Sequence, residues 1–118
     1  MQQTALIVEG DPGTRHVLSS TLATAGIESL HAATGAAMWQ QLEQAPSIVI
    51  LDLSLPDSNG LELLRQLRQT SDVPVLIHTQ LSDEIERINS IESGADDFLP
   101  KPSTPEDPGQ IEARMNQI

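Results

Sequence analysis

The sequence has no cysteine, no long hydrophobic run and few basic residues. Without cysteine, disulfides and thiolate metal sites are excluded, which is compatible with a reducing compartment. The longest apolar runs are far shorter than the roughly 18–20 residues of a membrane-spanning helix. No basic segment precedes the first apolar run, so no secretory signal is indicated. We therefore expect a cytoplasmic protein with no membrane partner.

The charge is strongly unbalanced. Six Lys and Arg residues stand against 17 Asp and Glu residues, giving a formal net charge of −11 at pH 7. Such a field repels nucleic-acid phosphates, so this chain alone should not bind nucleic acid. Lys101 is the sole lysine, and arginines supply the other fixed side-chain cations.

Short runs rich in Ile, Val and Leu alternate with longer segments that carry helix signals. The length of 118 residues fits one domain, residues 1–118, with a real hydrophobic core. Continuous apolar runs favour strands buried on both faces, and an alternating run favours an edge strand. The predicted strands are residues 5–8, 27–32, 48–51, 75–77 and 97–99, of which 27–32 is the edge strand.

Capping residues mark the predicted helices. Asp11 and Thr34 are expected as N-caps, Gly60 opens a third helix, and Ser82 or Asp83 caps a fourth. Apolar residues at helical spacing are expected to face inward: Val17, Leu18, Leu22 and Ala25; Met38, Trp39 (core or half-core) and Leu42; Leu61, Leu64 and Leu67; Ile85, Ile88 and Ile91. After an irregular stretch, STPEDPG, a short last helix is expected over about 108–118. This repeated βα pattern predicts an α/β fold with a parallel sheet.

Polar side chains follow four of the predicted strands. Glu9 follows the first, Asp52 the third and Thr79 the fourth, while Lys101 lies just beyond the fifth. Ligands of open α/β sheets bind at the carboxyl ends of the strands, so these groups should converge. Each alone has an ordinary structural explanation, such as a turn aspartate or a solvated loop lysine. Together they suit phosphoryl transfer to a carboxylate, which needs positioning and charge neutralisation.

Four stretches, ALIVEGDP, IVILDLSLPDSNGLELLRQLR, VPVLIHTQ and GADDFLPKP, occur in an order that resembles the receiver domains of two-component response regulators. The resemblance runs from Ala5 through at least Pro102. It implies a flavodoxin-like, doubly wound five-stranded sheet of order 2-1-3-4-5. It also implies that Asp52 accepts a phosphoryl group from a sensor histidine kinase or phosphotransfer protein, with Mg²⁺ as cofactor.

The resemblance also assigns roles to single residues. Glu9, Asp52 and the Ser54 backbone carbonyl match metal ligands, and Lys101 matches the phosphate-binding lysine. Thr79 and Phe98 match the family's switch pair. It further implies a cis Lys101–Pro102 bond, and dimer or partner contacts on the face formed by the fourth helix, fifth strand and fifth helix.

The sequence departs from the family pattern at two positions of the site. The family carries two adjacent acids after the first strand, and here these positions are Glu9 and Gly10. Asp11, one residue further on, is expected as an N-cap, with a substitute metal ligand as the alternative. Gln80 follows Thr79 where the family has a small residue, which narrows access to Asp52.

Three functions compete. The leading one is a phosphoacceptor switch that is no enzyme beyond its own phosphorylation and dephosphorylation. The second is a receiver-like interaction module, poorly or not phosphorylated because of Gly10. The third is an aspartate-nucleophile phosphohydrolase, which Ser54 disfavours because such enzymes generally have an acid at that position. His78 should be packed rather than catalytic, and Asp57 belongs first to turn chemistry, with no functional role expected beyond its loop.

Overall fold

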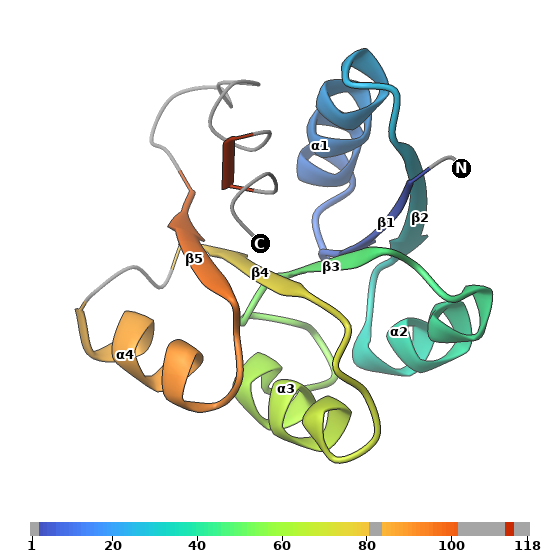
Figure 1. Ribbon diagram of the computed structural model, residues 1–118. Helices are drawn as coiled ribbons and strands as arrows, with labels where there is room; N and C mark the ends of the chain where they lie inside the picture. Colours follow the sequence, from blue (N-terminus) through green and yellow to red (C-terminus); the bar gives the residue numbers. More distant parts are fainter. Residues whose placement is uncertain (1–2, 81–83, 102–112, 115–118) are drawn as a thin grey trace.

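A computed structural model describes residues 3–80, 84–101, 113 and 114 of this chain. Its centre is a parallel five-stranded sheet of order β2-β1-β3-β4-β5 (Figure 1). The strands are β1 (Thr4–Val8), β2 (Glu28–Ala32), β3 (Ile48–Leu51), β4 (Val75–Thr79) and β5 (Asp97–Pro100). The predicted α/β class and strand order are confirmed, and β2 is an edge strand.

Helices cover both faces of the sheet. They are α1 (Pro12–Thr24), α2 (Gly35–Gln41) with a following 3₁₀ turn (Leu42–Gln44), α3 (Gly60–Arg68) and α4 (Glu84–Glu92). α1 lies on one face, and α2, α3 and α4 lie on the other (Figure 1). Within the described ranges, no helix has the length and apolarity needed to cross a membrane.

Several sequence predictions lie outside the described residues. These are the caps Ser82 and Asp83, the cis bond before Pro102, the irregular stretch 103–109 and most of the last helix. Of that predicted helix, 108–118, the structure describes Ala113 and Arg114, which are helical.

Side-chain caps fix where the first three helices begin. The Asp11 carboxylate accepts a hydrogen bond from the Thr14 amide at 2.8 Å, and Thr34 Oγ1 accepts one from the Ala37 amide at 3.0 Å. Asn59 caps α3 from one residue before Gly60. These bonds satisfy amides that have no partner inside the helix, so the chain turns into each helix at a defined residue.

The core consists of two layers, one on each face of the sheet. The α1 side buries mainly Ala5, Ile7, Leu18, Leu22, Ile48, Ile50, Leu76 and Leu99. The opposite layer includes Leu6, Val8, Met38, Val49, Leu51, Leu63, Leu64, Leu67, Val75, Ile77 and Phe98. Alternate residues of β1, β3 and β4 enter opposite layers, so these strands are apolar throughout.

Some inward-facing predictions were wrong. On α4, Ile85, Ile88 and Ile91 are 69%, 43% and 42% exposed, while Ser90 is fully buried and its hydroxyl donates to the Glu86 carbonyl. Val17, Ala25 and Trp39 are also exposed. On α3 the fully covered residues are Leu63, Leu64 and Leu67, with Leu61 partly buried. Helical spacing identifies residues that share a face, but it does not say which face a sheet covers.

Candidate functional site

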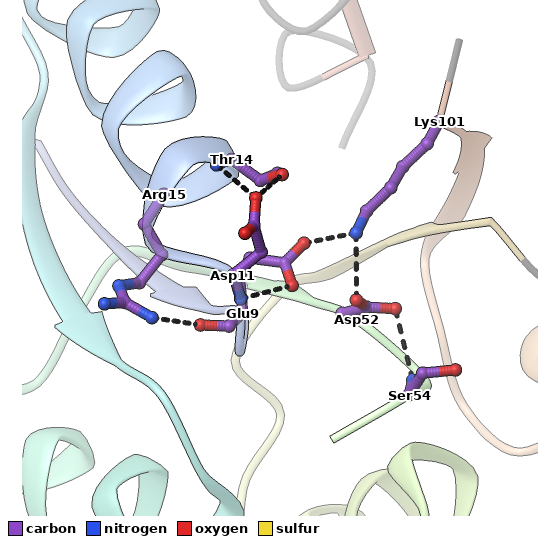
Figure 2. A network of polar contacts seen from close by, with 7 residues as sticks. All are labelled: Glu9, Asp11, Thr14, Arg15, Asp52, Ser54 and Lys101. Atoms are coloured by element: carbon purple, nitrogen blue, oxygen red, sulfur yellow. Dashed lines mark hydrogen bonds and ion pairs between the residues drawn. The ribbon is translucent and has the colours of Figure 1, made fainter. Parts of the chain in front are cut away.

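Three of the predicted polar residues meet at the carboxyl edge of the sheet. Lys101 Nζ lies 3.0 Å from Asp52 Oδ2 and forms an ion pair with Glu9 Oε1 (Figure 2). The three side chains are only 12%, 6% and 4% exposed, in that order. Thr79 enters through its backbone, because its carbonyl accepts a 2.8 Å hydrogen bond from the Lys101 amide. The convergence expected from the strand ends is therefore present.

Burial and charge set the ionisation of this cluster. For Asp52, burial favours the neutral acid, but hydrogen bonds from Lys101 and the Ser54 amide outweigh it, and its pKa falls below the ordinary value. For Glu9, burial dominates, and with the nearby charge of Asp52 it raises the pKa. Although burial alone disfavours its charge, Lys101 has a raised pKa because it bonds to both carboxylates. Of the two carboxyl groups, Asp52 therefore loses its proton more readily than Glu9.

The loop after β1 is held by its own backbone and by α1. The Asp11 amide donates to Glu9 Oε2 at 3.2 Å, and Arg15 donates to the Glu9 carbonyl at 2.7 Å. The Asp11 carboxylate points toward the first turn of α1, where it accepts hydrogen bonds from the amide and hydroxyl of Thr14 (Figure 2). Asp11 is thus the N-cap, as predicted. Sequence reasoning missed the contact of Arg15, since its acceptor is a backbone carbonyl.

The cluster opens into a surface hollow of about 520 Å³. Residues from the first turn of α1 and from the loops after β1, β3, β4 and β5 line it: Glu9, Gly10, Asp11, Thr14, Asp52, Ser54, Pro56, Gln80 and Lys101. Asp52, although only 5% exposed, therefore lines a hollow that is open at the surface. Gln80 is on its wall, as expected from its position after Thr79.

The oxygen donors of the hollow suit a hard divalent cation. Glu9 and Asp52 supply two carboxylates, and Ser54, whose backbone carbonyl the resemblance matches to a metal ligand, also lines the hollow. Among the described residues, no group of three or more His, Cys, Asp and Glu side chains is arranged to hold a metal ion. The donor set therefore fits a cation in kind, but it has one carboxylate fewer than the family pattern because of Gly10.

Comparison with known proteins decides the family. The family model that describes the response regulator receiver domain matches residues 5–112 of this chain. This chain belongs to the response regulator receiver domains. Receiver domains of this kind act in two-component systems, pair with histidine kinases and generally bind Mg²⁺ at the acidic site.

Individual relatives agree with this assignment. The chain is 37% identical over 111 residues to the KDP operon transcriptional regulatory protein KdpE of Escherichia coli K12, covering 93% of this chain and 48% of that protein. A putative response regulator from Chloroflexus aurantiacus has a TM-score of 0.89, 32% identity and coverage of 98% and 96%. The BeF₃-activated receiver domain of Klebsiella pneumoniae RstA has a TM-score of 0.88, 28% identity and coverage of 97% and 96%. The chain spans about half the length of the curated relatives it matches.

The two residues that match the receiver switch pair are both buried. Thr79 is fully covered at the end of β4, and Phe98, 4% exposed, lies in the core layer that contains Leu63 and Ala95. His78 is 1% exposed, which confirms the prediction that it is packed. Burial, helped by the positive charge of Lys101, lowers the pKa of His78 to about 4, so His78 is neutral at pH 7.

Proposed function

We propose that this receiver domain is a phosphoacceptor switch whose acceptor is Asp52. The observation that carries the proposal is the contact of Lys101 with Asp52 at the floor of an open hollow. It pairs an ionised carboxylate nucleophile with a cation that also attracts phosphoryl oxygens. The donor is a phosphohistidine of a sensor histidine kinase or a phosphotransfer protein.

The reaction follows from the chemistry of the two groups. An Asp52 carboxylate oxygen attacks phosphorus, and an acyl phosphate bond forms as the phosphorus–nitrogen bond to imidazole breaks. The imidazole nitrogen keeps the electron pair of that bond and takes up a proton. Glu9, Asp52 and the Ser54 carbonyl would hold Mg²⁺, whose charge offsets that of the phosphoryl oxygens when it is bound. The domain is no enzyme beyond its own phosphorylation and dephosphorylation.

Lys101 and the switch pair turn the modification into a signal. A phosphoryl group adds negative charge and acceptors beside Lys101, so Lys101 binds the phosphorylated form more strongly than the unmodified one. Only such a difference can shift a conformational equilibrium. Lys101 is bonded through its amide to Thr79, which links the shift to β4. In this structure Phe98 is already buried, so we expect the response at Phe98 to be a repacking within the core rather than an entry from solvent.

The partner surface belongs to the same proposal. Exposed isoleucines on α4 (Ile85, Ile88 and Ile91) fit the homodimer or partner face expected for α4, β5 and the last helix. The net charge of −11 argues against nucleic-acid binding by this domain alone. A cytoplasmic location, the usual one for receiver domains, would give the domain access to its kinase.

A receiver-like module with little phosphorylation is the second candidate. Gly10 replaces one acid, Asp11 is engaged as an N-cap, and Lys101 already contacts both remaining carboxylates. These observations favour weak metal binding, which would slow phosphoryl transfer. In this case the domain would signal through its surface alone.

Mass spectrometry of the intact protein separates the two candidates. With Mg²⁺ and acetyl phosphate, or with a cognate kinase, the wild type should gain one phosphoryl group and Asp52→Asn should gain none. Asp72→Asn is the matched control, because Asp72 is an exposed acid outside the hollow. Full phosphorylation of Asp52→Asn would remove the acceptor assignment, and an unmodified wild type would favour the second candidate.

A further inference from the structure

The loop that follows Asp52 is attached to a helix that is distant in sequence. Asp57 Oδ1 accepts a hydrogen bond from the Gly35 amide at 2.8 Å, and Asp57 Oδ2 accepts one from the Ala36 amide at 3.2 Å. Both amides belong to the first turn of α2, so each carboxylate oxygen holds one of them. We call this pair of bonds the Asp57–α2 contact. The sequence interpretation of Asp57 as a turn residue did not include this contact.

Close packing accompanies these bonds. A Cβ atom at Gly35 would lie 2.5 Å from Ser58 Oγ and 2.9 Å from Leu63 Cδ1, closer than real Cβ atoms approach. The tip of the loop therefore rests directly on the backbone of α2. The Gly35 amide lowers the pKa of Asp57 most, so the carboxylate remains ionised well below neutral pH.

The near end of the same loop forms part of the hollow. The Ser54 amide donates to Asp52 Oδ1 at 3.2 Å, and Ser54 and Pro56 line the hollow. A Cβ atom at Gly10 would lie 3.3 Å from Pro56 Cδ, so this loop also contacts the loop after β1. Where the loop ends, the Gly60 amide donates to the Leu53 carbonyl at 3.0 Å. Few residues thus separate the Asp52 carboxylate from the Asp57–α2 contact.

We propose that Asp57 is a positioning residue for Asp52. By holding the loop tip on α2, it fixes the Ser54 amide against the Asp52 carboxylate and keeps Pro56 at the rim of the hollow. The phosphorylation part of this inference rests on the proposed function, whereas the loop part does not. The inference assigns to α2, which lies outside the hollow, a role in the geometry of the phosphoacceptor.

A pair of alanine variants isolates this role. Asp57→Ala removes the Asp57–α2 contact, whereas Thr34→Ala removes the other side-chain cap of α2, the 3.0 Å bond to Ala37, and leaves the loop attached. Both weaken the start of α2 by similar means. The first readout is amide hydrogen exchange at Ser54, relative to the core amide of Ile50 in the same protein. The second is the rate of phosphorylation by acetyl phosphate as Mg²⁺ is varied.

Asp57→Ala should speed relative exchange at Ser54 about fivefold, as expected for the loss of two hydrogen bonds, one part-buried and one exposed. It should slow phosphorylation by about the same factor, while Thr34→Ala changes neither. Asp57→Asn, which keeps one acceptor oxygen, should be intermediate, and it provides the same test should the alanine variant fold poorly.

Two contrary outcomes are distinguishable. Equal Ser54 exchange in Asp57→Ala and Thr34→Ala would overturn the positioning role, whether or not Asp52 is phosphorylated. Fast exchange at Ser54 with an unchanged phosphorylation rate would overturn the link between the loop and phosphoryl transfer. If the wild type itself takes up no phosphoryl group, the proposed function fails, and the Ser54 exchange alone then decides whether Asp57 positions the loop.

Discussion

Two partly buried cations lie at opposite ends of this sheet, and their surroundings differ. At the amino end of β4, Arg68 donates to the carbonyls of Gly94 at 2.8 Å and Val73 at 2.7 Å, and to Asp96 Oδ2 at 3.0 Å. At the carboxyl edge, Lys101 faces two buried carboxylates, Glu9 and Asp52. Backbone carbonyls accept most of the hydrogen bonds that Arg68 donates, whereas the single ammonium of Lys101 is shared by two carboxylates.

The difference separates a structural site from a reactive one. A guanidinium with several fixed acceptors has one arrangement and stabilises the fold. An ammonium between two carboxylates can change partners, because a new anion in the hollow competes for it. The following predictions test this contrast, from the largest expected effect to the smallest.

Arg68→Ala should be the most destabilising change. It leaves the Gly94 and Val73 carbonyls without this donor and removes the ion pair with Asp96, so we expect a loss of about 4 kcal/mol in the free energy of unfolding. Denaturant titration measures this loss, with the exposed Arg65→Ala as control. The Asp52 phosphorylation rate should be unchanged under conditions where the variant is folded. A change of less than about 1 kcal/mol would mean that Arg68 is no more structural than a surface ion pair.

His78→Gln should change the pH dependence of stability. The unfolded chain binds a proton near the ordinary pKa of 6.5, whereas folded His78 stays neutral to about pH 4. In the wild type, stability should therefore fall as the pH drops from about 6.5 to 4, by about 3 kcal/mol. The variant, which cannot titrate there, should show a flatter curve in urea titrations over this window. Parallel curves would mean that His78 is protonated inside the fold.

Much of the fold could be predicted from the sequence, because strands buried on both faces are continuous apolar runs. Every residue of β3 is buried, and its predicted bounds, 48–51, match the structure. The meeting of Glu9, Asp52 and Lys101 follows as well, since parallel strands end at one edge of a sheet. Family resemblance adds roles that spacing alone does not supply.

Other features could not be predicted because their partners are backbone atoms. Arg68 and Arg15 donate hydrogen bonds to backbone carbonyls. Every residue has a backbone carbonyl, so the sequence does not show which one is the acceptor. Asp57 accepts hydrogen bonds from amides 22 and 21 residues away. An aspartate at this position is equally typical of a turn, so the local sequence does not indicate the contact. The exposed face of α4 was misplaced for a related reason: only the packed structure shows which side of a helix meets the sheet.

Lys101→Ala should affect both charge and signalling. Without the ammonium, burial and mutual repulsion raise the pKa of Glu9 and Asp52, so the variant loses stability as the pH rises through these values. At pH 7 we expect the free energy of unfolding to fall by about 2 kcal/mol. This loss is smaller than for breaking a fully buried ion pair, because the cluster opens to the hollow. Urea titrations at pH 5 and pH 7 measure this trend.

The signalling effect of Lys101→Ala needs a second measurement. Asp52 remains, so some phosphorylation should persist, but the response near Phe98 and α4 should be lost. NMR shifts with and without beryllium fluoride report this response, and Arg87→Ala on exposed α4 is a control. A full response without Lys101 would reduce it to a lysine that merely neutralises its neighbours.

Gly10→Asp should have the smallest effect, and it tests the carboxylate that the hollow lacks. The new Cβ would lie 3.3 Å from Pro56 Cδ and 3.7 Å from the Ala33 carbonyl, so a shift of a few tenths of an ångström accommodates it. A third carboxylate should tighten Mg²⁺ binding about tenfold, or about 1.4 kcal/mol. Repulsion with Glu9 and Asp52 should lower the stability of the metal-free protein.

Gly10→Asn is the matched control, because it has nearly the same shape without the charge. Calorimetric Mg²⁺ titration of the wild type and both variants then separates the carboxylate from the steric change. Tighter binding by Gly10→Asp alone would mean that the missing carboxylate, rather than the shape of the hollow, limits metal binding. Equal affinities in all three proteins would show that the existing oxygens already suffice, and would remove the main argument for a receiver that signals without phosphorylation.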